Sequence, residues 1–385
     1  MNRDKTAATR APHIAIDLWR QMLARARDNE WSTFDDGKPE AEEQREATRQ
    51  AFRNAGWSDE EIAAHFELDR MRLLDVPTTS PGVAKITEFG LERLRRALSG
   101  ALSGFDAAKV HFAVEPKAGP FVSTVNVPMT DETIITMGTH FTRYCGLIAR
   151  AYTRTVNLNV FDAGFNCDEP SLRQRLRRNP ELLLYWWRIF NSYALTGTHA
   201  LAPFKPSTRD EALLMEQMAF AMEIFALAHE YGHHSLSHGR SVVDGAQARQ
   251  EEFEADQFAA RVCELVERAE RFRWLPGREL LNPYLSTGAG GILLLGSLEI
   301  FRKVKDRIFR NQHFDSHPSY AERAARIRSR SVLEPQKFAT ALDFAGSAES
   351  ILRCVLLELA PMMQSFPYDR FANSLPGDWE IASHS

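Results

Sequence analysis

Paired cysteines are the first feature that this sequence lacks. Only four cysteines occur among 385 residues, and their spacing fits neither a disulfide framework nor a cysteine-ligated zinc site. Isolated thiols of this kind are typical of buried side chains in a reducing compartment. We therefore expect neither disulfides nor metal ligation from the four positions, which are Cys145, Cys167, Cys263 and Cys354.

Long apolar segments are also missing. The best candidates, Gly288–Gly296 and Glu181–Trp187, are much shorter than the roughly 20 residues that a membrane-spanning helix requires. The N-terminal residues contain no apolar core of roughly 7–15 residues, which a secretory signal peptide would carry. These absences predict a protein that works in the cytoplasm and does not insert into membranes.

An excess of basic residues is absent as well. The formal net charge is -4 and the pI is about 6.3, so neither nucleic acid nor an anionic membrane surface is an expected partner. A short basic stripe near the aromatic residues Tyr185–Trp187 is the exception, and we interpret it as a solvated helix face. The stripe consists of Arg173, Arg175, Arg177 and Arg178.

The residues that are present predict an α+β protein that is mainly helical. Hydrophobic residues make up 44% of the chain and charged residues 25%, which is ordinary for a globular protein with a large core. Prolines at 77, 81 and 335 suggest three parts. These are an N-terminal helical region (1–80), a central domain (81–335) with an insertion at about 156–208, and a C-terminal helical extension (336–385).

Three short runs rich in β-branched residues predict a small sheet early in the central domain. They are Val110–Val114, Phe121–Val127 and Thr133–Gly138. Helices are predicted on both sides of the sheet from the spacing of apolar residues and from helix-start signals. Their expected ranges are Thr87–Leu102, Phe141–Thr155, Arg209–Gly239, Gln250–Arg271, Ile292–Arg310 and Tyr320–Arg328.

The helix predicted over Arg209–Gly239 carries the strongest chemical signal. Near its C-terminal end stands His229-Glu230-Tyr231-Gly232-His233, an H-E-x-x-H pattern. Two imidazoles one helical turn apart can hold a zinc ion, while the glutamate acts as a base toward water. Gly232 would let a second backbone come close. Earlier on the same face, Met218, Met222 and Phe225 are expected to pack in the core.

A catalytic zinc site needs a third protein ligand and an open fourth position. His238 does not fit the metzincin pattern, because that pattern requires Gly at 236 and His at 239, where this chain has Leu236 and Gly239. Asp244 lies in a polar loop without supporting context. Neither position is therefore the predicted third ligand.

Glu252 is the predicted third ligand. It opens the run Glu252-Phe253-Glu254-Ala255-Asp256, in which Glu252 and Asp256 share one helix face. An antiparallel pair of helices would bring that face against the two histidines. Asp256 would then accept the free ring N–H of a ligand histidine and fix its orientation. Glu251 and Glu254 are expected to point into solvent.

The two-helix pattern, H-E-x-x-H followed by E-x-x-A-D, resembles the gluzincin metallopeptidases. It is similar above all to the family that contains the CAAX prenyl endopeptidase and the heat-shock protease HtpX. The segment Thr133–Gly138, which precedes the site helices, and Ser316-His317-Pro318, followed by Arg323, also resemble that family. The resemblance covers roughly residues 85–330. The chain departs from many family members because it lacks their transmembrane helices.

The resemblance implies a zincin-like core and a zinc-dependent metalloendopeptidase with one zinc ion per chain. Glu230 would take a proton from water and pass it to the leaving amine. His317, Tyr320 and Arg323 are the candidates for stabilising the oxyanion. A protein or peptide substrate would add to the sheet edge near Phe121–Val127.

Two further hypotheses accompany this one. The same site is compatible with a catalytically silent, zinc-stabilised helical protein that binds a partner through its groove. If the protein is active, the N-terminal region or residues 156–208 would cover the cleft until a regulatory partner displaces them.

Overall fold

The computed structural model describes most of the chain between residues 81 and 365. The longer gaps in this description are 157–167, 203–208, 241–243, 310–317 and 331–342, and only isolated positions are described between residues 49 and 63. Residues 1–48, 64–80 and 366–385 lie outside it, so the predicted N-terminal helical region falls almost wholly outside the described residues.

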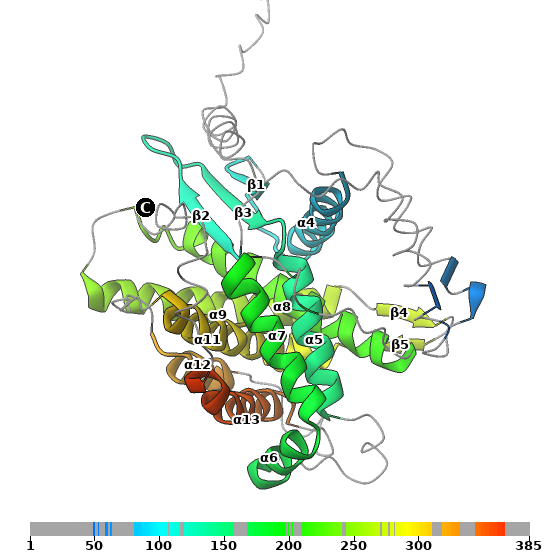
Figure 1. Ribbon diagram of the computed structural model, residues 1–385. Coiled ribbons are helices and arrows are strands. Elements are labelled where there is room, and N and C mark those ends of the chain that lie inside the picture. The colour runs from blue at the N-terminus through cyan, green and yellow to red at the C-terminus, as the bar shows by residue number, and fades with distance from the viewer. Residues whose placement is uncertain are drawn as a thin grey trace, which may run out of the picture.

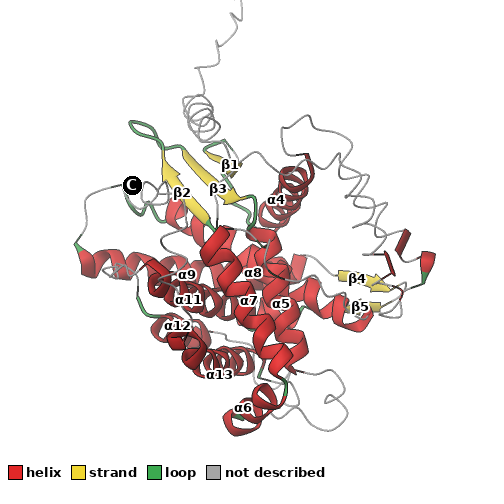
Figure 2. Cartoon of the chain, viewed as in Figure 1, coloured by secondary structure: helices red, strands yellow, loops and turns green. Residues whose placement is uncertain are grey.

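The fold is α+β and mainly helical, as predicted. A small sheet lies against one end of a helical body, and the long helices pass through that body in several directions (Figures 1 and 2). Among the described residues, no helix combines the length and the apolar character that crossing a bilayer would require.

The sheet consists of the three predicted strands; the last has the predicted ends, and no end of the other two differs by more than one residue. These are β1 (Val110–Glu115), β2 (Val122–Asn126) and β3 (Thr133–Gly138). The strand order is β1-β3-β2, with β1 parallel and β2 antiparallel to β3. All six residues of β3 are buried, as expected for a central strand. In the described part of the chain, β2 is therefore an edge strand.

Helix α8 (Arg209–Ser235) is the centre of the helical body. It packs against α5 (Phe141–Val156), α9 (Gly245–Ala269), α11 (Ala289–Phe309) and the strands β2 and β3. Met218, Met222 and Phe225 are almost completely buried, which confirms that this face is core. A helix surrounded in this way is expected to be apolar over most of its circumference.

At Gly232 the helices α8 and α9 come close to each other. A Cβ atom at this position would lie 3.2 Å from the Phe258 ring and 3.3 Å from the Cα atom of Ala255. The absence of a side chain at Gly232 therefore lets the two helices that carry the predicted ligands come together.

The segment predicted as an insertion contributes to the core. It contains α6 (Glu169–Arg178) and α7 (Pro180–Thr196), and α7 packs against α5 and α11. Trp186 and Phe190 are fully buried, so the aromatic run is a structural layer of the domain rather than an appendage. The reason is its apolar content, which needs a partner surface.

The basic stripe of α6 is only partly solvated, which corrects the sequence interpretation. Arg173 and Arg177 both bind Glu358 of α13 (Phe344–Ser365), at 2.7 and 2.9 Å. Arg175 donates to the carbonyl groups of Thr155 and Val156 at the end of α5. These guanidinium groups tie α6 to its neighbours.

The remaining elements complete the body. Helix α4 (Pro81–Ala101) begins at Pro81, earlier than predicted, because proline is well suited to the first turn of a helix and does not interrupt it there. A two-stranded hairpin, β4 (Phe272–Leu275) and β5 (Arg278–Leu280), follows α9. The short α10 (Pro283–Ser286) then leads into α11, and α12 (Tyr320–Arg330) lies between α11 and α9.

Candidate metal centre

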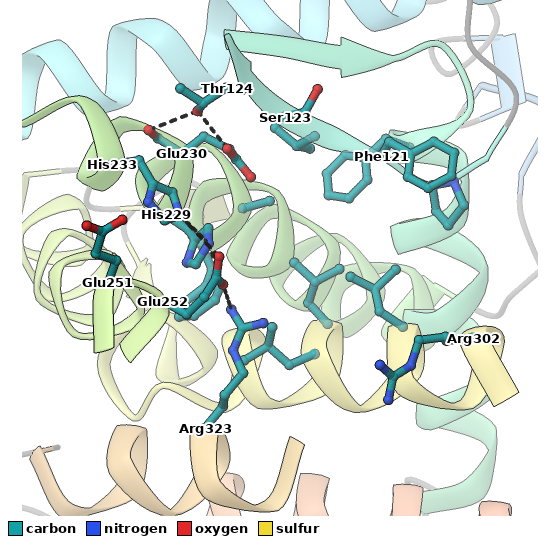
Figure 3. Close-up of a pocket in the computed structure, with 18 of the residues that line it drawn as sticks. Phe121, Ser123, Thr124, His229, Glu230, His233, Glu251, Glu252, Arg302 and Arg323 are labelled. Atoms are coloured by element: carbon teal, nitrogen blue, oxygen red, sulfur yellow. Dashed lines mark hydrogen bonds and ion pairs between the residues drawn. The ribbon is translucent and has the colours of Figure 1, made fainter. Parts of the chain in front are cut away.

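The predicted ligands His229, His233 and Glu252 come together where α8 and α9 cross. The Nε2 atoms of the two histidines are 3.1 Å apart. The Glu252 carboxylate lies 3.5 Å from Nε2 of His229 and 3.7 Å from Nε2 of His233. Figure 3 shows the three side chains converging from the two helices. The Glu252 carboxylate thus faces His229 with its Oε2 atom and His233 with its Oε1 atom.

These separations suit a zinc ion. Tetrahedral zinc with bonds of roughly 2.0–2.1 Å places neighbouring ligand atoms roughly 3.3 Å apart. The two nitrogen atoms are 3.1 Å apart, and their distances to the two carboxylate oxygen atoms, 3.5 and 3.7 Å, are close to that value. In the described residues, these three are the group of His, Cys, Asp or Glu side chains whose ligand atoms cluster closely enough to hold a metal ion.

Asp256 lies beside the other ring nitrogen of His229. Its Oδ1 atom is 3.0 Å from His229 Nδ1, and the carboxylate is completely buried. Arg323 donates two hydrogen bonds to the same carboxylate, and its Nη2 atom also lies 3.5 Å from Glu252. Burial acts to raise the pKa of Asp256, but Arg323 and His229 outweigh it and lower that pKa. Asp256 therefore remains charged.

The two ligand histidines have opposite electrostatic surroundings. Burial opposes protonation of His229, yet Asp256 and Glu252 outweigh it and raise its pKa to about 10. Burial, reinforced by the charge of His229, lowers the pKa of His233 to about 4. The carboxylates of Asp256 and Glu252 thus attract positive charge to this place. A bound cation at the same place would meet the same attraction.

Glu230 lies beside the cluster without belonging to it. Its carboxylate accepts a 2.6 Å hydrogen bond from Thr124 of β2, and the Thr124 hydroxyl also contacts the Glu230 backbone carbonyl. Burial raises the pKa of Glu230 above its usual value. Figure 3 shows Thr124 and Glu230 on one side of the two histidines, and Glu252 and Arg323 on the other.

A cavity of about 720 Å³ opens over the cluster. Strand β2 lines one side of it and α11 the other, while α8 forms the floor. The wall contributed by α11 is apolar near the metal ligands and ends in charged residues. Its lining side chains are Leu294, Leu295, Leu298, Phe301, Arg302, Lys305 and Asp306.

The end of α8 brings one further histidine to the site. The backbone N–H of His238 donates to the carbonyl of His233, and that of Ser237 donates to His234, which is the hydrogen-bond pattern of a Schellman cap. Ser237 occupies the left-handed position of this motif, with φ 60°, where glycine is usual. Because the expected Gly is missing there, the sequence did not reveal that His238 folds back onto His233.

Two acidic residues expected in solvent also have defined contacts, which corrects that prediction. Glu254 lies 3.2 Å from Nε2 of His238, with 42% of its side chain exposed. Glu251 accepts a hydrogen bond from the backbone of Gly239. Both residues point toward the turn that follows α8, since α9 runs back alongside it.

The three candidates for oxyanion stabilisation have different outcomes. His317 lies outside the described residues. Tyr320 packs against α11 near Gly296, and its buried hydroxyl is not part of the cavity lining. Arg323 does line the cavity, but its guanidinium group binds Asp256. The geometry therefore gives Arg323 a supporting contact behind the ligands.

Comparison with known proteins yields no match to a protein-family model, to a curated protein or to a solved structure. The resemblance to gluzincins thus stays a prediction that is carried by the site residues.

Proposed function

We propose that the protein is a zinc-dependent metalloendopeptidase of the gluzincin type. The observation that carries the proposal is the placement of Glu230. This half-buried carboxylate stands next to a three-donor cluster that suits zinc and faces the same cavity, but it is not one of the donors. A separate base beside an incomplete ligand set is the arrangement that metal-assisted hydrolysis requires.

His229, His233 and Glu252 would hold the metal, and Asp256 would orient His229. When bound, zinc supplies Lewis acidity, which activates water and polarises the scissile carbonyl group. Glu230 would accept the proton of the attacking water and later deliver it to the leaving amine. Desolvation raises the pKa of Glu230, which makes its carboxylate a stronger base toward the proton of the attacking water. Thr124 holds the carboxylate in place through its 2.6 Å hydrogen bond.

An extended peptide is the substrate that the cavity fits best. Strand β2 lines the cavity with residues 122–124 and 126, and among the described residues no strand pairs with its outer edge. A peptide added to such an edge forms backbone hydrogen bonds, and every second side chain then points toward the cavity floor. The apolar part of the α11 wall would contact those side chains.

A purely structural zinc site is the competing function. Structural zinc is usually enclosed by four protein ligands, whereas the described residues supply three. A structural site also has no use for a second carboxylate beside the ligands, such as Glu230. We therefore favour hydrolysis.

The test compares wild-type protein with Glu230→Gln after both are loaded with zinc. We expect about one zinc per chain in each, cleavage of a peptide library by the wild type, and a loss of cleavage of at least about 100-fold in the variant. Glu264→Gln is the matched control and should cleave normally, because this half-buried glutamate of α9 pairs with Arg261 and does not line the cavity. Equal cleavage by wild type and Glu230→Gln, or no cleavage by zinc-loaded wild type, would contradict the proposal.

A further inference from the structure

His233 is linked to a second histidine through the ring nitrogen that faces away from the cluster. Its Nδ1 atom is 3.2 Å from Nδ1 of His238, and Nε2 of His238 is 3.2 Å from Glu254. We propose that His238 is a positioning residue for the ligand His233, and that Glu254 fixes the tautomer of His238. This inference rests on the metal-binding part of the proposed function, not on hydrolysis.

A metal ion bound to His233 would determine which ring nitrogens carry protons in the series His233, His238 and Glu254. If His233 binds through Nε2, which faces His229 and Glu252, its remaining proton is on Nδ1. That N–H can only donate to His238 if Nδ1 of His238 carries a lone pair. His238 must then hold its own proton on Nε2, where Glu254 accepts it. Each link therefore contains one donor and one acceptor, and no group is left unsatisfied.

The fold holds His238 firmly in this orientation. Its backbone N–H donates to the carbonyl of His233, and its own carbonyl accepts from Asn126 of β2. The residue is 6% exposed. Ser237 takes the strained positive φ that this turn requires, although it is not glycine. Four contacts, two from the backbone and two from the ring, thus fix one side chain behind the ligand.

The two ligand histidines therefore have supports of different strength. His229 is backed by the completely buried carboxylate of Asp256, which two bonds from Arg323 hold in place. His233 is backed by an imidazole and then by the partly exposed Glu254. Loss of a contact of this kind typically weakens metal binding by about 10–100-fold. We expect His238 to fall near the lower end of that range and Asp256 near the upper end.

The test is the zinc dissociation constant, measured by competition with a chelator on the full chain. His238→Leu removes the acceptor for His233 and should weaken zinc binding by about 10-fold. His238→Asn places an amide oxygen where Nδ1 was, so it should restore most of the affinity. His234→Gln is the control, because that neighbouring histidine bonds Thr133 instead of a ligand. It should bind zinc like the wild type.

The melting temperatures of the metal-free proteins show whether a variant loses zinc affinity because it is less stable. If His238 acted only as a structural cap, His238→Leu and His238→Asn would lower zinc affinity equally, or both would leave it unchanged. Either result would overturn the proposal. Should His238→Leu fail to fold, Glu254→Leu provides the second variant, because leucine cannot accept the Nε2 proton of His238. A smaller loss of zinc affinity is then expected, and unchanged affinity would overturn the proposal. If His229→Ala loses zinc but the His238 variants bind zinc as tightly as the wild type, this inference is rejected and the proposed function is not. A wild type that binds zinc without cleaving peptides would do the reverse.

Discussion

Arg323 and Asp256 form a buried ion pair with two hydrogen bonds of 2.6 Å each, directly behind the ligand His229. The pair joins α12 to α9, and through His229 it reaches α8. Two buried charges of this kind are stable only while both are present. Arg323, one of the candidates for stabilising an oxyanion, thus also supports the candidate metal ligands.

Removal of the Arg323 side-chain charge should therefore destabilise both fold and site. We expect Arg323→Met to lower the free energy of unfolding by about 3–5 kcal/mol, because it leaves the Asp256 carboxylate buried without its partner. Arg323→Lys should recover only part of this loss, since an ammonium group cannot form the two parallel bonds. Denaturant unfolding of the metal-free proteins measures the effect. Wild-type stability in Arg323→Met would show that the pair does not hold the site together.

Gly232 should be equally sensitive to an added side chain. Gly232→Val would push α8 away from α9, because even a Cβ atom would lie 3.2 Å from the Phe258 ring. We expect a loss of about 1–3 kcal/mol in stability. Zinc binding should also weaken, because His233 lies on α8 and Glu252 on α9. Gly146, whose added Cβ would meet nothing within 4 Å, offers a matched control on α5. Calorimetry and chelator competition would check the two effects, and unchanged zinc affinity would refute the second.

The cluster itself could be predicted from the sequence because its pattern is local. His229 and His233 are one turn apart on a helix, and Glu252 and Asp256 are one turn apart on the next, so periodicity alone put each pair on one face. A loop between antiparallel helices then sufficed to bring the faces together. The three strands could also be predicted from a local signal, because they are rich in β-branched residues.

The rest depended on contacts between distant segments, which one sequence does not encode locally. Thr124 meets Glu230 only because β2 is the edge strand above α8. The core position of α7 depends on the partner surfaces of α5 and α11. His238 was considered only as a metal ligand. The turn that directs it toward His233 has Ser237 where glycine is usual, so the sequence carries no signal for that turn.

Thr124 provides a test of how the base is held. Thr124→Val keeps the shape of the side chain but removes the hydroxyl that donates to Glu230 at 2.6 Å. We expect peptide cleavage to fall by roughly 10-fold through kcat, as a bond of about 1–1.5 kcal/mol implies. The zinc content should not change. Ser123→Ala, which removes a hydroxyl paired with Thr136, should have a smaller effect. A variant with normal kcat would mean that Glu230 does not need this contact.

Glu223 predicts how stability changes with pH. Burial is the main reason that its pKa rises from 4.5 to about 8. The folded state therefore binds a proton that the unfolded state has released between these two values, so stability falls as pH rises from about 4.5 to 8. Glu223→Gln should remove this loss, on the order of a few kcal/mol at pH 8, and change little near pH 4. Urea unfolding at the two pH values measures it. A variant that is no more stable than wild type at pH 8 would contradict the assignment.

The zinc content of the purified protein shows whether His229, His233 and Glu252 together hold one zinc ion. We expect about one zinc per chain in the wild type and in His234→Gln. His229→Ala and His233→Ala should lose nearly all of it, and Glu252→Ala most of it. Stoichiometric zinc in His229→Ala, or none in a folded wild type supplied with zinc, would show that these residues do not form a zinc site.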